Sequence, residues 1–174
     1  HLHRLLPSLH WYACDVRADM IQWNQRNLAH INFAVTRQEP PLPFEHVKFD
    51  LMIGFSVLTH ISASLQLAWL SALAESLSDD GIVLFTTHGS AYQQHLSVKQ
   101  QAHLAAVGYW DNQRSNAGSR GRAIYHHAPT FQAIIEQYMD VLAWYDGSNY
   151  PSLIGGQDIW ICKKKSRNCG TEND

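Results

Sequence analysis

The feature that most constrains this chain is the run over residues 49–61. Asp50 leads into an apolar stretch over 51–53 that ends at Gly54, a short loop with Phe55 and Ser56 follows, and Ser62 opens an amphipathic segment. In α/β proteins with a parallel sheet, ligands bind in the crevice outside the carboxyl ends of the strands. The run therefore predicts an α/β fold with a ligand-facing loop directly after Gly54.

The rest of the chain alternates between strand-like and helix-like patterns. We predict strands over 11–14, 31–35, 49–55, 82–85, 141–145 and 158–162, and helices over about 20–28, 62–78 and 129–138. A turn-rich link joins the last two predicted strands, which is typical of an antiparallel hairpin. The order of elements predicts a doubly wound α/β sheet whose last strand runs antiparallel to the rest.

Composition excludes several classes of protein. The 174 residues suit one globular domain, and a net charge of −2 gives no reason to expect a nucleic-acid partner. No apolar run is long enough for a membrane span. The three cysteines, Cys14, Cys162 and Cys169, fit neither a disulfide framework nor a zinc ribbon, so we expect a reducing, cytoplasmic location.

Four stretches carry a resemblance to a known family, in the family's order. They are YACDV at 12–16, PLPF at 41–44 leading to FDL at 49–51, FSVLTH at 55–60, and LSDDGIVL at 77–84. With the terminal hairpin, they resemble class I S-adenosylmethionine-dependent methyltransferases. The resemblance implies a Rossmann-like, doubly wound, mostly parallel sheet with a C-terminal antiparallel hairpin, and S-adenosyl-L-methionine as the cofactor.

Two departures from the family pattern limit the resemblance. The glycine-rich first motif is absent, so we expect the first strand-helix unit to be missing and residues 1–6 to be the tail of its helix. We therefore expect a partial methyltransferase-like domain over 1–164, with an insertion over 89–124 and a disordered tail over 165–174, that is inactive alone. Arg37 stands where the family often has Asp for adenine, and a guanidinium cannot accept that hydrogen bond.

The resemblance assigns five residues to the cofactor. Asp15 would hold the ribose hydroxyls, Val16 would pack on adenine, and Gly54, Phe55 and Ser56 would line the sulfonium end. A carboxylate at the end of a parallel strand can accept both ribose hydroxyls. The alternatives are a turn aspartate near a helix start for Asp15, and ordinary core packing for Val16 and Phe55.

Five further residues are candidates for chemistry and acceptor binding. His60 and His88 follow the ends of adjacent predicted strands, where an imidazole could take a proton from a hydroxyl or amine nucleophile. The alternative for His60 is a helix-start histidine that bonds the backbone. Tyr92, Tyr125 and His127 lie in or beside the polar insertion and would form an acceptor-side wall, or a small satellite core.

Metal and phosphate sites have weaker support. The chain has 11 histidines, and five of them lie in or beside the insertion: His88, His95, His103, His126 and His127. None of their pairs has the helical spacing of a zinc protease and no cysteine lies near these five in the sequence, so we predict no metal site. Arg114, Arg120 and Arg122 form a short basic stretch, which is either an anion-binding loop or a solvated one.

Together these patterns predict methyl transfer to an oxygen or nitrogen of a small-molecule or glycan-like acceptor. One alternative is a non-catalytic, methyltransferase-like binding module. Another is an NAD-dependent Rossmann oxidoreductase, which also places an acidic residue after its second strand. The terminal hairpin and the 49–60 stretch argue against the oxidoreductase.

Overall fold

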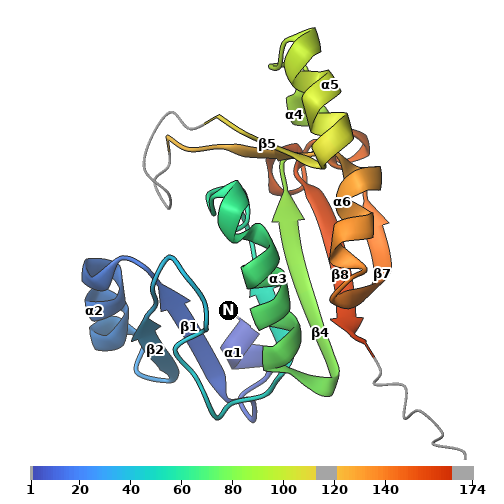
Figure 1. Ribbon diagram of the computed structural model, residues 1–174. Helices are drawn as coiled ribbons and strands as arrows, with labels where there is room; N and C mark the ends of the chain where they lie inside the picture. Colours follow the sequence, from blue (N-terminus) through green and yellow to red (C-terminus); the bar gives the residue numbers. More distant parts are fainter. Residues whose placement is uncertain (1, 113–120, 166–174) are drawn as a thin grey trace, which may run out of the picture. The chain divides into compact units, whose positions relative to one another are not determined.

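The computed structural model describes residues 2–112 and 121–165 (Figure 1). The chain folds as two compact units, His1–His46 and Val47–Asp174. The single domain over 1–164 stays a prediction. Apart from Lys165, the predicted tail lies outside the described residues, as do Arg114 and Arg120.

The first unit is a parallel two-stranded sheet with one crossing helix. Its elements are α1 (Leu2–Leu5), β1 (Trp11–Asp15), α2 (Ala18–Asn27) and β2 (Ile31–Val35). Trp11 pairs with Ile31 and Asp15 with Val35, so both strands end at the same edge. Ile21 is the buried anchor of α2. The two strands and the helix predicted from the apolar periodicity are confirmed.

The second unit contains a four-stranded sheet and a two-stranded hairpin. Its elements are β3 (Phe49–Gly54), α3 (Ala63–Ser76), β4 (Leu77–Thr87), α4 (Ser90–Gln93), α5 (Val98–Val107), β5 (Tyr109–Asp111), β6 (Ile124–His126), α6 (Ala128–Ile135), β7 (Met139–Tyr145) and β8 (Asp158–Lys164), with short 3₁₀ turns at Gly147–Asn149 and Ile154–Gly156. The larger sheet has the order β3-β4-β8-β7. Strands β3 and β4 are parallel, and β8 is antiparallel to both neighbours, which confirms the predicted terminal hairpin.

One face of the larger sheet carries the core. Both α3 and α6 pack on this face and lie in front of the sheet in Figure 1. The cluster is Leu58, Leu70, Ala74, Leu77, Val83, Phe85, Phe131, Ile135, Met139, Trp160 and Cys162. On the opposite face, Leu51 pairs with Ile82 and Ile53 with Leu84, and Leu51 and Ile53 are exposed. Apolar side chains therefore lie on both faces of the sheet, whereas α3 and α6 cover one of these faces.

Two parts of the second unit differ from the predicted elements. The predicted insertion contains α4, α5 and β5, because Ser97 and Gln100 form a capping box and Gly108, with φ of 94°, ends the helix. Strand β4 begins at Leu77, before Gly81, and a register shift against β3 accommodates the early start. None of the helices in the described ranges is both long and apolar enough to cross a membrane.

Candidate functional site

The loop after β3 holds a non-glycine residue in the left-handed backbone region. Ser56 has φ of 55°, a conformation that persists only where its surroundings over-determine it. Its backbone N–H donates to Thr86 Oγ1 across 2.8 Å, and its carbonyl accepts from Thr59 Oγ1 across 2.9 Å. Both backbone polar groups of Ser56 are therefore fixed by side chains.

The Ser56 side chain belongs to a closed polar network with two buried partners. Thr86 Oγ1 donates to Gln157 Oε1 at 2.5 Å, and Gln157 Nε2 donates to Ser56 Oγ at 2.6 Å. Thr86 is fully buried and Gln157 nearly so. Among the described residues, the Ser56 hydroxyl hydrogen has no acceptor. Sequence patterns did not reveal Thr86 or Gln157, because each looks like a polar residue at a strand end.

The residues before Ser56 are a glycine that packing does not require and an exposed aromatic ring. A Cβ built on Gly54 would come no closer than 3.7 Å to its neighbours, so packing does not require glycine there. Phe55 is 53% exposed, which excludes the alternative that it is strand-end core. A glycine without a packing reason, beside an exposed aromatic ring, is what a ligand-facing loop needs.

His60 is oriented by a backbone carbonyl. Its Nδ1 lies 2.7 Å from the Arg122 carbonyl oxygen. Because a carbonyl can only accept, Nδ1 carries the proton, and Nε2 keeps the lone pair in the neutral ring. This bond agrees with the alternative that His60 is a helix-start histidine that bonds the backbone. It also fixes the tautomer in which Nε2 can accept a proton. Gln66 supports the same loop, since its Nε2 donates to the carbonyls of Leu58 at 2.9 Å and Ile61 at 3.0 Å.

His88 joins two of the predicted acceptor-side residues. Its ring stacks on Tyr92 with centroids 4.2 Å apart, and the Tyr125 ring lies 5.8 Å away. Burial lowers the pKa of His88 to about 4, with a smaller contribution from the positive charge of His60, while a hydrogen bond with the Ile124 backbone acts in the opposite direction. His88 is therefore neutral near pH 7, and only a weak base.

His127, the third predicted acceptor-side residue, has the contacts of a helix-start residue. It occupies the N-cap position of α6, and its Nδ1 lies 2.9 Å from Thr130 Oγ1. Its backbone N–H donates to the Gly108 carbonyl at 2.9 Å. These contacts hold α6 against the end of α5. A role in acceptor binding for His127 stays a prediction.

His126 is a buried histidine that the sequence did not single out. It is fully buried, neither ring nitrogen has a partner within the described ranges, and the ring packs on Phe131 with centroids 4.4 Å apart. Burial, with a smaller contribution from the nearby charge of His88, lowers its pKa to about 3. Strand alternation is the signal that could have indicated its burial, because Ile124 and His126 lie on one face of β6 and Tyr125, which is half-buried, lies on the other.

Arg122 does not serve as an exposed anion-binding residue. Its Nε donates to both carboxylate oxygens of Asp111, at 3.0 and 3.1 Å, and the two side chains are 14% and 6% exposed. The solvated and anion-binding hypotheses are therefore wrong for Arg122. The pair instead ties the hairpin to the start of α3, where the Ala63 N–H approaches Asp111 Oδ2 at 3.4 Å.

In the first unit, Asp15 lies at the carboxyl end of β1. Its Oδ1 accepts from the Arg17 N–H at 2.8 Å, and Oδ2 accepts no hydrogen bond from the described residues. Val16 is 40% exposed, which excludes the alternative that it is core. An exposed carboxylate beside an exposed apolar side chain fits a ribose and its attached base. Neither unit contains, within its described residues, a group of three or more metal-ligating side chains.

Comparisons with known proteins identify the fold. No protein-family model and no curated protein matches the sequence. One solved structure that matches is N-methyltransferase NodS from Bradyrhizobium japonicum with S-adenosyl-L-homocysteine, at 14% identity over 95% of this chain and 72% of that chain, with a TM-score of 0.60. Another is a S-adenosylmethionine-dependent methyltransferase from Clostridium acetobutylicum, at 11% identity over 95% of this chain and 79% of that chain, with a TM-score of 0.62. A third is 1,6-didemethyltoxoflavin-N1-methyltransferase from Burkholderia thailandensis with bound 1,6-didemethyltoxoflavin and S-adenosylhomocysteine, at 12% identity over 95% of this chain and 65% of that chain, with a TM-score of 0.63.

The chain therefore has the Rossmann-like fold of S-adenosylmethionine-dependent methyltransferases, which confirms the resemblance at the level of fold. The fold alone does not determine the reaction. The matching structures also include a pericyclic reaction enzyme, at 9% identity over 94% of this chain and 39% of that one, with a TM-score of 0.59.

Proposed function

We propose that the protein is an S-adenosylmethionine-dependent methyltransferase that acts on an oxygen or nitrogen of a small-molecule or glycan-like acceptor in the cytoplasm. The observation that carries the proposal is the loop after β3, where packing does not require glycine at Gly54, Phe55 is exposed and Ser56 is fixed by Thr86 and Gln157. S-adenosylmethionine, when bound, would supply an electrophilic methyl group on a positively charged sulfur.

The loop after β3 suits that positive charge. Because Gly54 has no side chain, a ligand can approach the backbone closely there. The exposed ring of Phe55 can favour a cation through its electron-rich face. The Ser56 hydroxyl keeps one hydrogen to donate, and its network holds that donor in place. Pre-positioned groups of this kind align reactants rather than react themselves.

Asp15 and Val16 would serve the nucleoside. The unused Oδ2 of Asp15 and the remaining lone pairs of Oδ1 can accept hydrogen bonds from two adjacent hydroxyl groups. The exposed Val16 offers apolar surface to a purine ring.

We propose His60, rather than His88, as the base. The nucleophile's lone pair forms a bond to the methyl carbon while the bonding pair of the carbon–sulfur bond returns to sulfur, and the displaced proton passes to His60 Nε2. The Arg122 carbonyl holds His60 in the tautomer that can accept this proton. His88, with a pKa of about 4, takes a proton poorly at neutral pH and would act as a neutral wall beside the acceptor.

Two structural relatives favour a small molecule as the acceptor and a nitrogen atom as the methylated atom. NodS is an N-methyltransferase, and the Burkholderia enzyme methylates N1 of a small heterocycle that is bound in its structure. The free thiols of Cys14 and Cys162 suit a reducing compartment.

The experiment is methyl transfer from deuterium-labelled S-adenosylmethionine by the protein as its gene encodes it, in a metabolite extract analysed by mass spectrometry. We expect a labelled product that disappears in His60→Ala and survives in His46→Ala, which changes an exposed histidine. Binding of S-adenosylhomocysteine without any labelled product would favour the non-catalytic binding module. Binding of NAD instead would favour the oxidoreductase.

A further inference from the structure

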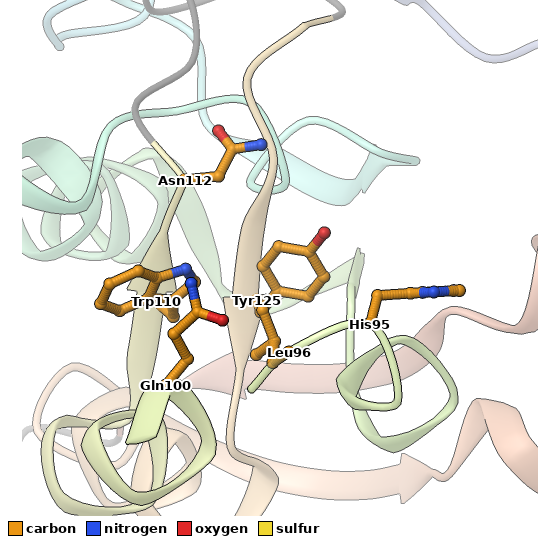
Figure 2. Close-up of a pocket in the computed structure, with 6 residues that line it drawn as sticks. All are labelled: His95, Leu96, Gln100, Trp110, Asn112 and Tyr125. Atoms are coloured by element: carbon orange, nitrogen blue, oxygen red, sulfur yellow. The ribbon is translucent and has the colours of Figure 1, made fainter. Parts of the chain in front are cut away.

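A cavity of about 190 Å³ lies between the β5–β6 hairpin and the α4–α5 segment. Figure 2 shows Trp110 and Tyr125 on adjacent strands, and the Gln100 side chain extends toward them from α5. Its lining is His95, Leu96, Gln100, Trp110, Asn112 and Tyr125. The proposed methyl transfer assigns no role to this cavity.

Strand alternation explains why these side chains share the cavity. Trp110 and Tyr125 are directly paired across the hairpin, so their side chains emerge on the same face. The neighbours of Tyr125, Ile124 and His126, point to the opposite face and are fully buried. The hairpin therefore has one face in the protein interior and one aromatic face toward the cavity.

The lining selects for a neutral, flat ligand. Among the described residues, the lining has no lysine, arginine, aspartate or glutamate to pair with a charged ligand, which would lose hydration on entering. Two large aromatic side chains, Trp110 and Tyr125, offer apolar ring surface. Rings stack well on such surfaces in offset or edge-on arrangements.

The amide groups present hydrogen-bond donors rather than acceptors. Gln100 Oε1 accepts from the Ser97 N–H at 2.8 Å and from Ser97 Oγ at 3.0 Å, which fixes the carboxamide with Nε2 on its other side. Asn112 Oδ1 accepts from the Ala123 N–H at 3.1 Å. Both amide oxygens of the lining are thus engaged. A ligand would meet the donors of Gln100 Nε2 and the Trp110 indole.

We infer that this cavity binds the methyl acceptor, and that the acceptor is a neutral, planar heterocycle carrying carbonyl or ring-nitrogen hydrogen-bond acceptors. The inference rests on the proposed function. The cavity adjoins the candidate site, because the Tyr125 ring that lines it lies 5.8 Å from the ring of His88. A sugar suits the cavity less well, since each of its hydroxyl groups also needs an acceptor, and of the described lining side chains the Tyr125 hydroxyl and the His95 ring remain for that role beside the engaged amide oxygens.

Gln100→Glu tests the inference without removing the helix cap. A glutamate at this position keeps the capping-box oxygen, but replaces the N–H donor by a carboxylate oxygen. The probe is caffeine, a neutral planar ring with carbonyl groups and no acidic proton, titrated by calorimetry into the protein as its gene encodes it. We expect caffeine to bind, and Gln100→Glu to weaken its binding by about tenfold. Gln22→Glu, the same change at an exposed position outside the cavity, should have no effect.

Three results would overturn the inference. They are no caffeine binding to the unmodified protein, equal caffeine binding by Gln100→Glu, and binding of N-acetylglucosamine that Gln100→Glu abolishes. The proposed function is tested separately by S-adenosylhomocysteine. Caffeine binding without S-adenosylhomocysteine binding would leave the cavity assigned and remove the methyltransferase. The reverse result would retain the methyltransferase and remove the planar acceptor.

Discussion

Gln157 Nε2 donates a hydrogen bond to Ser56 Oγ across 2.6 Å, although 101 positions separate the two residues in the chain. The bond joins the start of β8 to the loop after β3, and Thr86 of β4 lies between them. Three strands thus contribute to holding one residue in a left-handed conformation. Such a loop keeps its shape before a ligand arrives.

Replacing Gln157 by Glu should loosen this loop. Thr86 can still donate to the remaining Oε1, but the Ser56 hydroxyl would have to donate to the new carboxylate and so lose the hydrogen that it keeps for a ligand, and the carboxylate charge would be nearly buried. We expect a loss of about 1–3 kcal/mol in the free energy of unfolding, measured by urea denaturation. Affinity for S-adenosylhomocysteine should also fall more than tenfold. Gln22→Glu should change neither quantity, and an unaltered affinity in Gln157→Glu would refute the positioning role.

Substitutions of Ser56 separate backbone strain from the hydroxyl group. Glycine adopts φ of 55° readily and alanine does not, so Ser56→Ala should be less stable than Ser56→Gly by about 1 kcal/mol. Both variants lack the hydroxyl, and both should bind S-adenosylhomocysteine more weakly than the unmodified protein. Equal stability of the two variants in urea would show that the left-handed conformation is not enforced.

Gly54 and Gly89 should respond differently to alanine. A Cβ at Gly54 meets only ordinary contacts at 3.7 Å and beyond, so Gly54→Ala should change the free energy of unfolding by less than about 0.5 kcal/mol while weakening ligand binding. A Cβ at Gly89 would collide with the Asp158 carboxylate, which the Gly147 N–H and the Trp144 indole hold in place. Gly89→Ala should therefore destabilise the fold. The account fails at this point if Gly54→Ala binds S-adenosylhomocysteine normally.

Stability should fall in mild acid because two buried histidines resist protonation. The folded state lowers the pKa of His88 to about 4 and of His126 to about 3, from an ordinary value of 6.5. Below pH 6.5 the unfolded chain takes up protons that the folded chain does not, so stability is full above pH 6.5 and declines as the pH falls toward 4 and then 3. His126→Phe should flatten the decline in urea titrations, and the exposed His46→Phe should not. A decline that His126→Phe leaves unchanged would contradict the assignment.

The sequence predicted most of the sheet because its elements carry local signals. The strand at 31–35 alternates, the stripe on α3 repeats at helical spacing, and the turn-rich link before β8 is typical of a hairpin. Helix α5 escaped prediction because its apolar residues, mostly alanine and valine, form no clear buried stripe and Leu104 is the residue of the helix that is buried, although the capping residues Ser97 and Gln100 and the terminal Gly108 were visible.

The candidate site could be predicted only in part. The family resemblance assigns Asp15 and Gly54, which end their strands, and His60 is predicted from its place after a strand end. The partners that orient the site come from distant segments: Gln157 for Ser56, the Arg122 carbonyl for His60, and Asp111 for Arg122. No local pattern specifies which distant residues meet, because tertiary packing decides it. The structure also gives His60 and His88 different chemical characters, although their sequence positions made them look alike.

Calorimetric titration with S-adenosylhomocysteine, on the protein as its gene encodes it, tests the central claim most directly. The decisive variant is Asp15→Ala, and its matched control is Asp19→Ala, which removes a nearby exposed carboxylate paired with Arg17. We predict binding that Asp15→Ala weakens about a hundredfold, because the ribose hydroxyls lose their charged acceptor, and that Asp19→Ala leaves unchanged. Absence of binding, or equal binding by Asp15→Ala, would contradict the assignment of this protein as an S-adenosylmethionine-dependent methyltransferase.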